Sequence, residues 1–189
     1  LIKLVYWFGM LAQIFIRAPF AIKARSRKRN VQRASLTENI VLGLLTVGSL
    51  LLPLIYSVTR WLAFADYRLP ATASWAGILI LIASLLVFWR AHADLDANWS
   101  PSLEMYEGHT LITSGIYRQI RHPMYASQFI WSIAQMLLIQ NWIAGPAGLI
   151  VLVPFYLLRR RAEETMMLEQ FGDQYREYLE STGSILPKL

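Results

Sequence analysis

The segment from His109 to Phe129, HTLITSGIYRQIRHPMYASQF, carries the residues best suited to chemistry. Within it, Arg121, His122 and Pro123 directly precede an apolar run. Proline is favoured in the first turn of a helix, because the N–H that it lacks would have no partner there. The sequence therefore predicts His122 at a helix N-terminus, where unpaired N–H groups form a site for an anion such as a carboxylate.

A polar stripe continues along the same predicted helix. Tyr125, Gln128, Ser132 and Gln135 recur at spacings of three and four, which places them on one helical face. In a membrane helix such a stripe either bonds neighbouring helices together or forms one wall of a ligand site. The sequence allows both interpretations.

A second charged group follows a later apolar run, in the sequence LLRRRAEET. Arginines and acids at this density most often form a solvated ion-pair patch. A helical hairpin would, however, return Arg159, Glu163 and Glu164 to the membrane face where His122 lies. Together with Tyr125 they could then hold a small zwitterionic molecule that also carries a positive charge.

The sequence lacks the residue patterns of several common kinds of active site. The chain has no cysteine, and His92, His109 and His122 lack a close ligand spacing, so we predict no metal site. The glycine patterns of dinucleotide-binding folds and of P-loops are absent, as are G-x-S-x-G and H-E-x-x-H. We therefore expect neither a Rossmann fold nor a phosphate-binding loop.

Composition points to the elements that must position these residues. Of 189 residues, 56% are hydrophobic and 16% charged, and the mean hydropathy is +0.39. These values predict an all-α polytopic membrane protein of one domain. The five predicted transmembrane helices are Ile2–Ile16, Ile40–Phe64, Trp75–Trp89, Met124–Ile139 and Trp142–Leu158.

The basic residues predict the topology. The net charge is +6, but the charges flank apolar runs, which favours a membrane over a nucleic-acid partner. With the loop between the first two helices in the cytosol, all basic residues except Lys3, Arg60 and Arg68 face the cytosol. This places the N-terminus outside and the polar site on the cytosolic face.

The last two predicted helices form an antiparallel hairpin with a turn at 140–148. Each has about sixteen residues and reaches roughly 24 Å, short of the ~30 Å hydrocarbon core. A cytosolic amphipathic helix is expected after Leu158, interrupted at Gly172.

Two blocks in this half resemble the isoprenylcysteine carboxyl methyltransferase family and, more widely, membrane methyltransferases that include phospholipid N-methyltransferases. The first is HxLxTSGxYxxxRHPxY, from His109 to Tyr125; the second has RxxxEE from Arg159 and FGxxYxxY from Phe171. Asn98 also fits, and the likeness extends over residues 98–186. Residues 1–97 are then N-terminal transmembrane helices, and 98–189 the cofactor-binding half of a single domain.

The resemblance implies an S-adenosylmethionine site built by the hairpin and the C-terminal helix. The resemblance implies that the cofactor is bound by Leu111, Gly115, Tyr117, His122, Pro123, Tyr125, Glu163, Glu164, Leu168 and Tyr175. We add Gln128 from the polar stripe to these residues. Arg121 or Arg159 would orient the acceptor. We expect an integral protein of a prokaryotic cell membrane, or of the endoplasmic reticulum in a eukaryote.

The implied reaction methylates the carboxylate of a lipophilic acceptor such as a C-terminal isoprenylcysteine. A carboxyl of pKa about 3.5 is already ionised, so no general base is needed. An amine acceptor, as in a phospholipid N-methyltransferase, would need one, and Glu104 or Glu107 are candidates. A sterol-type reductase and a non-enzymatic scaffold or transporter remain alternatives. Tyr6, Trp7, Trp89 and Trp99 either line the acceptor's entrance or anchor the helices at the membrane interface.

Overall fold

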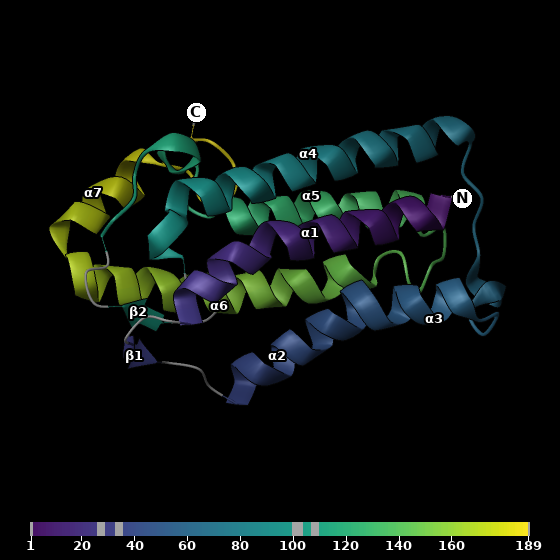
Figure 1. Ribbon diagram of the computed structural model, residues 1–189, viewed down its shortest axis with the longest axis horizontal. Helices are drawn as coiled ribbons and strands as arrows, with labels where there is room; N and C mark the ends of the chain where they lie inside the picture. Colours follow the sequence, from purple (N-terminus) through teal and green to yellow (C-terminus); the bar gives the residue numbers. More distant parts are fainter. Residues whose placement is uncertain (1, 26–28, 33–35, 100–103, 107–109, 189) are drawn as a thin grey trace.

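Long helices lie side by side and alternate in direction in the computed structural model (Figure 1). The structure describes residues 2–25, 29–32, 36–99, 104–106 and 110–188. The helices are α1 (Ile2–Arg25), α2 (Leu36–Thr46), α3 (Leu52–Val58), α4 (Ala71–Leu95), α5 (Pro123–Leu138), α6 (Ala147–Phe171) and α7 (Asp173–Ser181). A π-helical turn, Val47–Leu51, joins α2 to α3, so these two form one rod. The predicted helical membrane fold is confirmed.

Three of the five predicted membrane-spanning helices have the length and composition of a span in the described residues. Among the described residues, three helical stretches are long and apolar enough to cross a membrane: Ile2–Ala24, Ile40–Val58 and Ala71–Leu95. Helix α5 has only 16 residues, and α6 carries charged residues from Arg159 onward. By length and composition three described stretches qualify as membrane spans, and α5 and α6 lie beside them in the same bundle (Figure 1).

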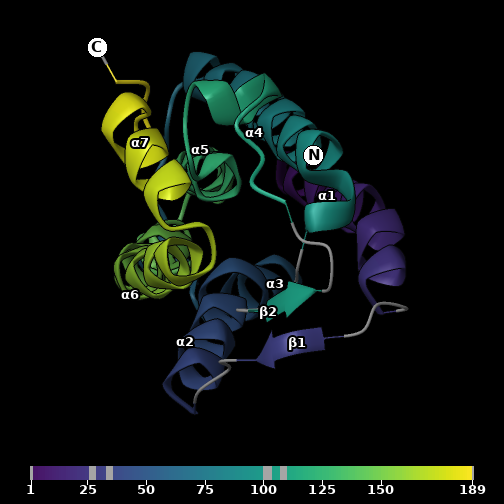
Figure 2. The same ribbon diagram turned by 90° about the vertical axis from the view of Figure 1, so that its left-hand side faces the viewer.

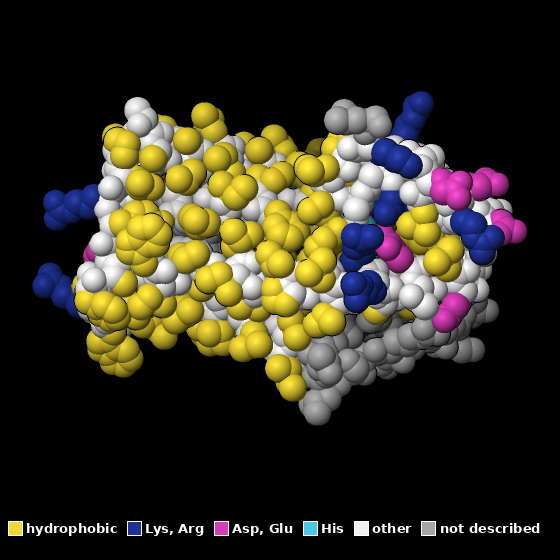
Figure 3. All heavy atoms as spheres, turned by 180° about the vertical axis from the view of Figure 1, so that it is seen from behind, with side chains coloured by type: hydrophobic (Ala, Val, Ile, Leu, Met, Phe, Trp, Pro, Cys, Tyr) yellow, Lys and Arg dark blue, Asp and Glu magenta, His cyan; other side chains and the backbone are white. Residues whose placement is uncertain are grey.

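The outer surface suits a lipid environment. Phe8, Phe15 and Phe64 are 68%, 75% and 80% exposed. Figure 3 shows apolar side chains spread over most of the bundle, while charged side chains gather at its ends, most densely at the end that carries α7. An apolar band between two polar ends is expected of helices that contact lipid along their length.

The predicted hairpin of α5 and α6 is present, but α6 is longer than expected. The sequence predicts a helix end near Leu158 and a separate amphipathic helix; instead α6 continues to Phe171. Pairs one turn apart, such as Arg159 with Glu163, keep this charged part helical. The predicted interruption lies at Gly172, whose φ is +53°.

Helix α5 carries the polar stripe, and its far end serves to join helices. Gln135 is fully buried and donates to the carbonyls of Gly48 (3.0 Å) and Ala144 (2.8 Å). Tyr6 from α1 donates to Oε1 of Gln135 (3.0 Å). Ser132 donates to the carbonyl of Gln128 in its own helix (2.9 Å). This half of the stripe therefore forms hydrogen bonds that hold α1, α5, the π-turn and the turn before α6 together.

Two short strands add a feature that the sequence does not predict. Strand β1 (Arg29–Gln32) pairs antiparallel with β2 (Glu104–Tyr106). This pairing joins the basic loop after α1 to the loop that follows α4. The rest of the basic loop's centre, at 26–28 and 33–35, and the candidate residues Glu107 and His109 lie outside the described residues.

Helix α7 and the tail after it cover the start of α5 (Figure 2). The backbone N–H groups of Arg121 and His122 donate to the carbonyls of Gly183 (2.8 Å) and Ser184 (2.9 Å). The Tyr178 hydroxyl donates to the carbonyl of Tyr117 (2.5 Å). The tail thereby fixes the backbone of the segment that the sequence marks as chemically important.

Candidate active site

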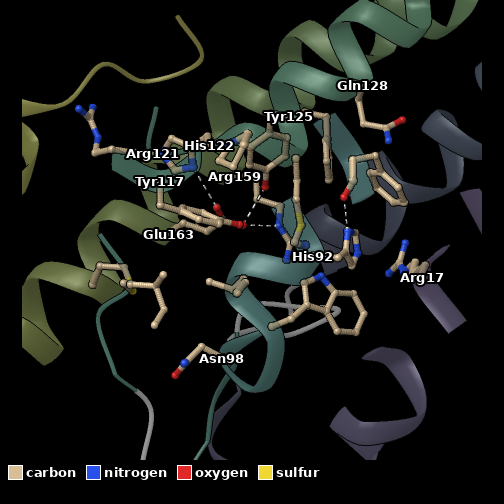
Figure 4. A pocket seen from close by; sticks show the side chains of 18 of the residues that line it. Arg17, His92, Asn98, Tyr117, Arg121, His122, Tyr125, Gln128, Arg159 and Glu163 are labelled. Atoms are coloured by element: carbon tan, nitrogen blue, oxygen red, sulfur yellow. Dashed lines mark hydrogen bonds and ion pairs between the residues drawn. The ribbon is translucent and has the colours of Figure 1, made fainter. Parts of the chain in front are cut away.

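A cavity of about 500 Å³ opens at the end of the bundle that carries α7. Its walls come from α1, α2, α4, α5, α6, α7 and the segment 110–123. Its size lies within the range of small-molecule sites, which is roughly 300–1,000 Å³. Figure 4 shows a cluster of charged side chains on one side of this cavity and Arg17 with His92 on another.

Glu163 is at the centre of the first cluster. Its Oε1 accepts hydrogen bonds from the Tyr125 hydroxyl (2.8 Å) and from Nε of Arg159 (2.9 Å). Nδ1 of His122 lies 3.5 Å from Oε2 of the same carboxylate. The N-terminus of α5 and the middle of α6 thus meet at one carboxylate that faces the cavity.

Glu164 supports the same histidine from behind. Its Oε1 lies 3.1 Å from Nε2 of His122 and 3.1 Å from Nη2 of Arg121, and its Oε2 accepts from Nε of Arg160 (3.2 Å). His122 therefore lies between two carboxylates, one on the cavity and one outside it.

This arrangement shifts the ionisation of all three groups. Burial lowers the pKa of His122, but hydrogen bonds and charge from Glu163 and Glu164 outweigh it, so the pKa is raised above 6.5. Burial raises the pKa of Glu163, yet His122 and Arg159 reverse this and hold it below 4.5. The pKa of Glu164 falls to about 2, because His122, Arg121 and Arg160 overcome its desolvation. The site therefore presents fixed charges of both signs.

Arg121 connects the cluster to α7. Its Nη1 donates to the carbonyls of Leu179 (3.2 Å) and Thr182. Its Nε is buried and has no hydrogen-bond partner. Buried donors are rarely left unpaired, so this N–H is an exception among the described side chains.

Most of the predicted site residues line one cavity: Leu111, Tyr117, Arg121, His122, Pro123, Tyr125, Gln128, Arg159, Glu163 and Tyr175. Gly115, Glu164 and Leu168 do not line it. Gly115 faces Asp94, Glu164 lies behind His122, and the Leu168 carbonyl ends α6 by accepting from the N–H of Gly172 (2.9 Å). These three residues support the site from outside.

The sequence does not mark Arg17, Gln13 or His92 as site residues, yet all three line the cavity. In the sequence, Arg17 serves only to predict the membrane topology. His92 is considered only as a metal ligand, and its spacing from the other histidines does not support that role. The spacing of four between Gln13 and Arg17, on an otherwise apolar helix, is the sequence signal that could have identified them as site residues. Among the described residues, no group of three or more histidines and acids could hold a metal ion.

Residues 75–169 match the model of the isoprenylcysteine carboxyl methyltransferase (ICMT) family, which is half of the chain. The chain therefore belongs to this family. The matched region contains most of α4, all of α5, most of α6 and most of the cavity wall.

Individual relatives agree with this assignment. The chain is 28% identical to protein-S-isoprenylcysteine O-methyltransferase A of Arabidopsis thaliana, over 74% of this chain and 72% of that protein. It is 36% identical to the protein-S-isoprenylcysteine O-methyltransferase of Tribolium castaneum, over 50% of this chain and 34% of the relative. The human enzyme of that name is also 36% identical, over 44% and 30% of the two chains.

A solved structure shares the fold. The eukaryotic intramembrane Ras methyltransferase ICMT, solved without a monobody, superposes with a TM-score of 0.55 at 24% identity. The superposition covers 83% of this chain and 54% of the other. This chain thus spans about half of the solved chain and about a third of the insect and human relatives.

Proposed function

We propose that this protein transfers a methyl group from S-adenosylmethionine to the carboxylate of a lipophilic acceptor such as a C-terminal isoprenylcysteine. The observation that carries the proposal is the cavity itself, in a chain of the ICMT family. One part of it holds fixed charges around Glu163 and His122, and another is lined by apolar side chains of α1 and α2.

The charged part fits the amino-acid portion of S-adenosylmethionine. That portion carries one ammonium and one carboxylate group. Glu163 is an acceptor for the ammonium, and the unpartnered Nε of Arg121 is a donor for the carboxylate. Leu111, Tyr117 and Tyr175 offer apolar and aromatic surface for the rest of the molecule.

The chemistry then requires alignment and exclusion of water. Bound S-adenosylmethionine supplies a methyl group on a positively charged sulfur, which a carboxylate oxygen can attack to leave two neutral products. No residue has to remove a proton, because the acceptor carboxyl is ionised at neutral pH. The helices bring the reactants together and keep out the water that would hydrate the carboxylate.

The apolar part of the cavity is suited to the lipid chain of the acceptor. Met10 and Ile14 of α1 face the cavity, as do Leu42 and Leu45 of α2. Ile14 is 57% exposed, so this wall continues to the outer surface of the bundle. We propose that the acceptor's tail enters sideways from the bilayer along these residues.

We further propose that α1, the rod of α2 and α3, α4, α5 and α6 all cross the membrane, with the N-terminus outside and the site on the cytosolic face of a prokaryotic cell membrane. Alternating helix directions and the distribution of basic residues support this topology.

The function is tested by incubating the purified protein in lipid nanodiscs with S-adenosylmethionine labelled in the methyl group. The acceptors are N-acetyl-S-farnesylcysteine, a fatty acid and phosphatidylethanolamine. We expect label in the farnesylcysteine alone. Label in phosphatidylethanolamine would support the amine alternative. Binding of reduced nicotinamide dinucleotide phosphate without S-adenosylmethionine binding would support a reductase.

A further inference from the structure

Arg17 on α1 and His92 on α4 lie on the side of the cavity away from Glu163 (Figure 4), and Trp99 also lines the cavity there. The guanidinium carbon of Arg17 lies 5.2 Å from the ring centroid of Trp99. The ring centroid of His92 lies 5.3 Å from the ring centroid of Trp99. Arg17 and His92 therefore approach the same indole and open into the same space.

Arg17 differs from the other arginines of the cavity in its partners. Arg121 and Arg159 each pair with a glutamate of α6. No described carboxylate pairs with Arg17, which lies over the Trp99 ring. Arg17 is exposed, and a guanidinium binds a carboxylate through two parallel N–H groups, so this side chain is free to bind an anionic ligand that enters the cavity.

Gln13 adds a second donor one helical turn before Arg17. Its Nε2 is buried and has no hydrogen-bond partner. Buried amide N–H groups without a partner are costly, so they indicate a ligand atom that accepts hydrogen bonds. Gln13 and Arg17 thus offer donors from the same face of α1.

His92 offers the opposite polarity. It is 1% exposed, and its Nδ1 lies 2.9 Å from the carbonyl oxygen of Phe88. A carbonyl only accepts, so Nδ1 carries the hydrogen and Nε2 of the neutral ring has a free lone pair. Nε2 is buried without a partner. The ligand atom that satisfies it must be an N–H or O–H donor.

We propose that Arg17 and Gln13 bind the carboxylate of the methyl acceptor and that Nε2 of His92 accepts the hydrogen bond of its amide N–H. This inference rests on the proposed function. A C-terminal prenylcysteine carries a carboxylate and an amide N–H on the same carbon, which matches a donor pair beside a single acceptor. In this assignment Arg121 and Arg159 do not bind the acceptor carboxylate. They belong to the charged cluster around Glu163, where each is already paired with a glutamate.

Two acceptors that differ in the amide alone test the role of His92. N-acetyl-S-farnesylcysteine has the carboxylate and the amide N–H, whereas S-farnesyl-3-thiopropionic acid has the carboxylate alone. We expect His92→Phe, which keeps an aromatic ring beside Phe88 and Trp99, to lower kcat/KM about tenfold for the first acceptor. It should change kcat/KM less than about twofold for the second, and His92→Gln should restore part of the loss.

Arg17 is tested with the same pair. Arg17→Met should raise KM at least about tenfold for both acceptors, while calorimetric affinity for S-adenosylmethionine stays within about twofold. The acceptor KM of Arg17→Lys should lie between that of the unmodified protein and that of Arg17→Met. The matched control is Arg60→Met, which removes an exposed arginine after α3 and should leave both KM values unchanged.

The outcomes separate this inference from the function on which it rests. Failure of the unmodified protein to methylate either acceptor contradicts the proposed function. Equal losses for both acceptors in His92→Phe would show that His92 is a packing residue. Weaker S-adenosylmethionine binding in Arg17→Met, with unchanged acceptor KM, would place Arg17 on the cofactor side. Either of the last two results overturns the inference and leaves the function intact.

Discussion

At the scale of single residues, the site depends on a histidine held between two carboxylates. His122 occupies the N-cap position of α5, and the order Arg-His-Pro explains this place: proline starts the helix and keeps the preceding residue out of the helical conformation (φ −124°, ψ 59°). Glu163 and Glu164 approach its two ring nitrogens from α6. The motif in the sequence predicts this meeting because both blocks end at the same face of the hairpin.

The ionisation of His122 gives the first prediction. Its pKa should exceed 6.5, and Glu164→Gln should lower it, because one of the two anions that stabilise the imidazolium is then neutral. The measurement is a pH titration followed by NMR of ¹³C-labelled histidine, with His122→Asn used to assign the signal. A pKa at or below 6.5 in the unmodified protein would contradict the ion-pair geometry.

The same shifts set the pH range of stability. The raised pKa of His122 contributes stability below 6.5, which is lost as pH rises through its folded value. The lowered pKa values of Glu163 and Glu164 contribute stability above 4.5, which is lost as pH falls toward about 2. The ionic network is therefore complete between these limits.

Adjacent glutamates provide a matched pair for the second prediction. Glu163 lines the cavity and Glu164 does not. We expect Glu163→Gln to weaken S-adenosylmethionine binding by about 1–3 kcal/mol, because a charged ligand loses a charged partner. Glu164→Gln should affect thermal stability more than affinity. Calorimetric titration of monodisperse protein compares them; equal affinities in both variants and the parent would mean that Glu163 does not contact the cofactor.

At the scale of elements, two glycines end or turn segments that the site requires. Gly115 and Gly172 both have positive φ, +61° and +53°. A Cβ at Gly115 would lie 2.1 Å from Oδ2 of Asp94, while a Cβ at Gly172 would meet nothing within 4 Å. Asp94 Oδ2 also accepts from the N–H of Ile116 (2.7 Å), which fixes the turn before Tyr117.

These surroundings give the third prediction. Gly172→Ala should cost about 1–2 kcal/mol of unfolding free energy from backbone strain alone. Gly115→Ala should cost more, because Asp94 must also move. Gly43→Ala is the control, since Gly43 lies within α2, has ordinary φ and meets nothing within 4 Å. Thermal unfolding ranks the three variants, and equal losses at Gly115 and Gly172 would show that the Asp94 contact does not constrain the turn.

Sequence patterns predict these elements unevenly. The helices follow from apolar runs and from proline and glycine at α5 and α6, because those signals are local. Apolar runs do not predict that α6 continues beyond Leu158, since a change to polar residues alone does not end a helix. The pairing of β1 with β2 joins segments some 75 positions apart in the numbering, and neither has a strong strand pattern. The exact partners of Arg17 and His92 likewise depend on how α1 packs against α4.

At the scale of the whole molecule, an apolar band separates two polar ends (Figure 3). The proposed topology places the end with α7 in the cytosol. The chain has no cysteine, so single cysteines report the two ends cleanly.

The fourth prediction tests this orientation in intact bacterial cells that express the protein. Ser181→Cys, at the exposed end of α7, should resist a membrane-impermeant thiol reagent until the cells are lysed. Ala71→Cys, at the exposed start of α4, should react at once. Labelling of Ser181→Cys before lysis would contradict the cytosolic placement of the site.

The central claim is that the acceptor is a carboxylate, and its most direct test is the pH dependence of methyl transfer at saturating S-adenosylmethionine. A carboxylate of pKa about 3.5 is ionised throughout, so the rate should be nearly flat from roughly pH 6 to 8 apart from any titration of His122. The labelled product should release methanol in mild alkali. An amine of pKa about 10 would instead give a rate that climbs up to tenfold per pH unit. That rise, with an alkali-stable product, would contradict carboxyl methylation.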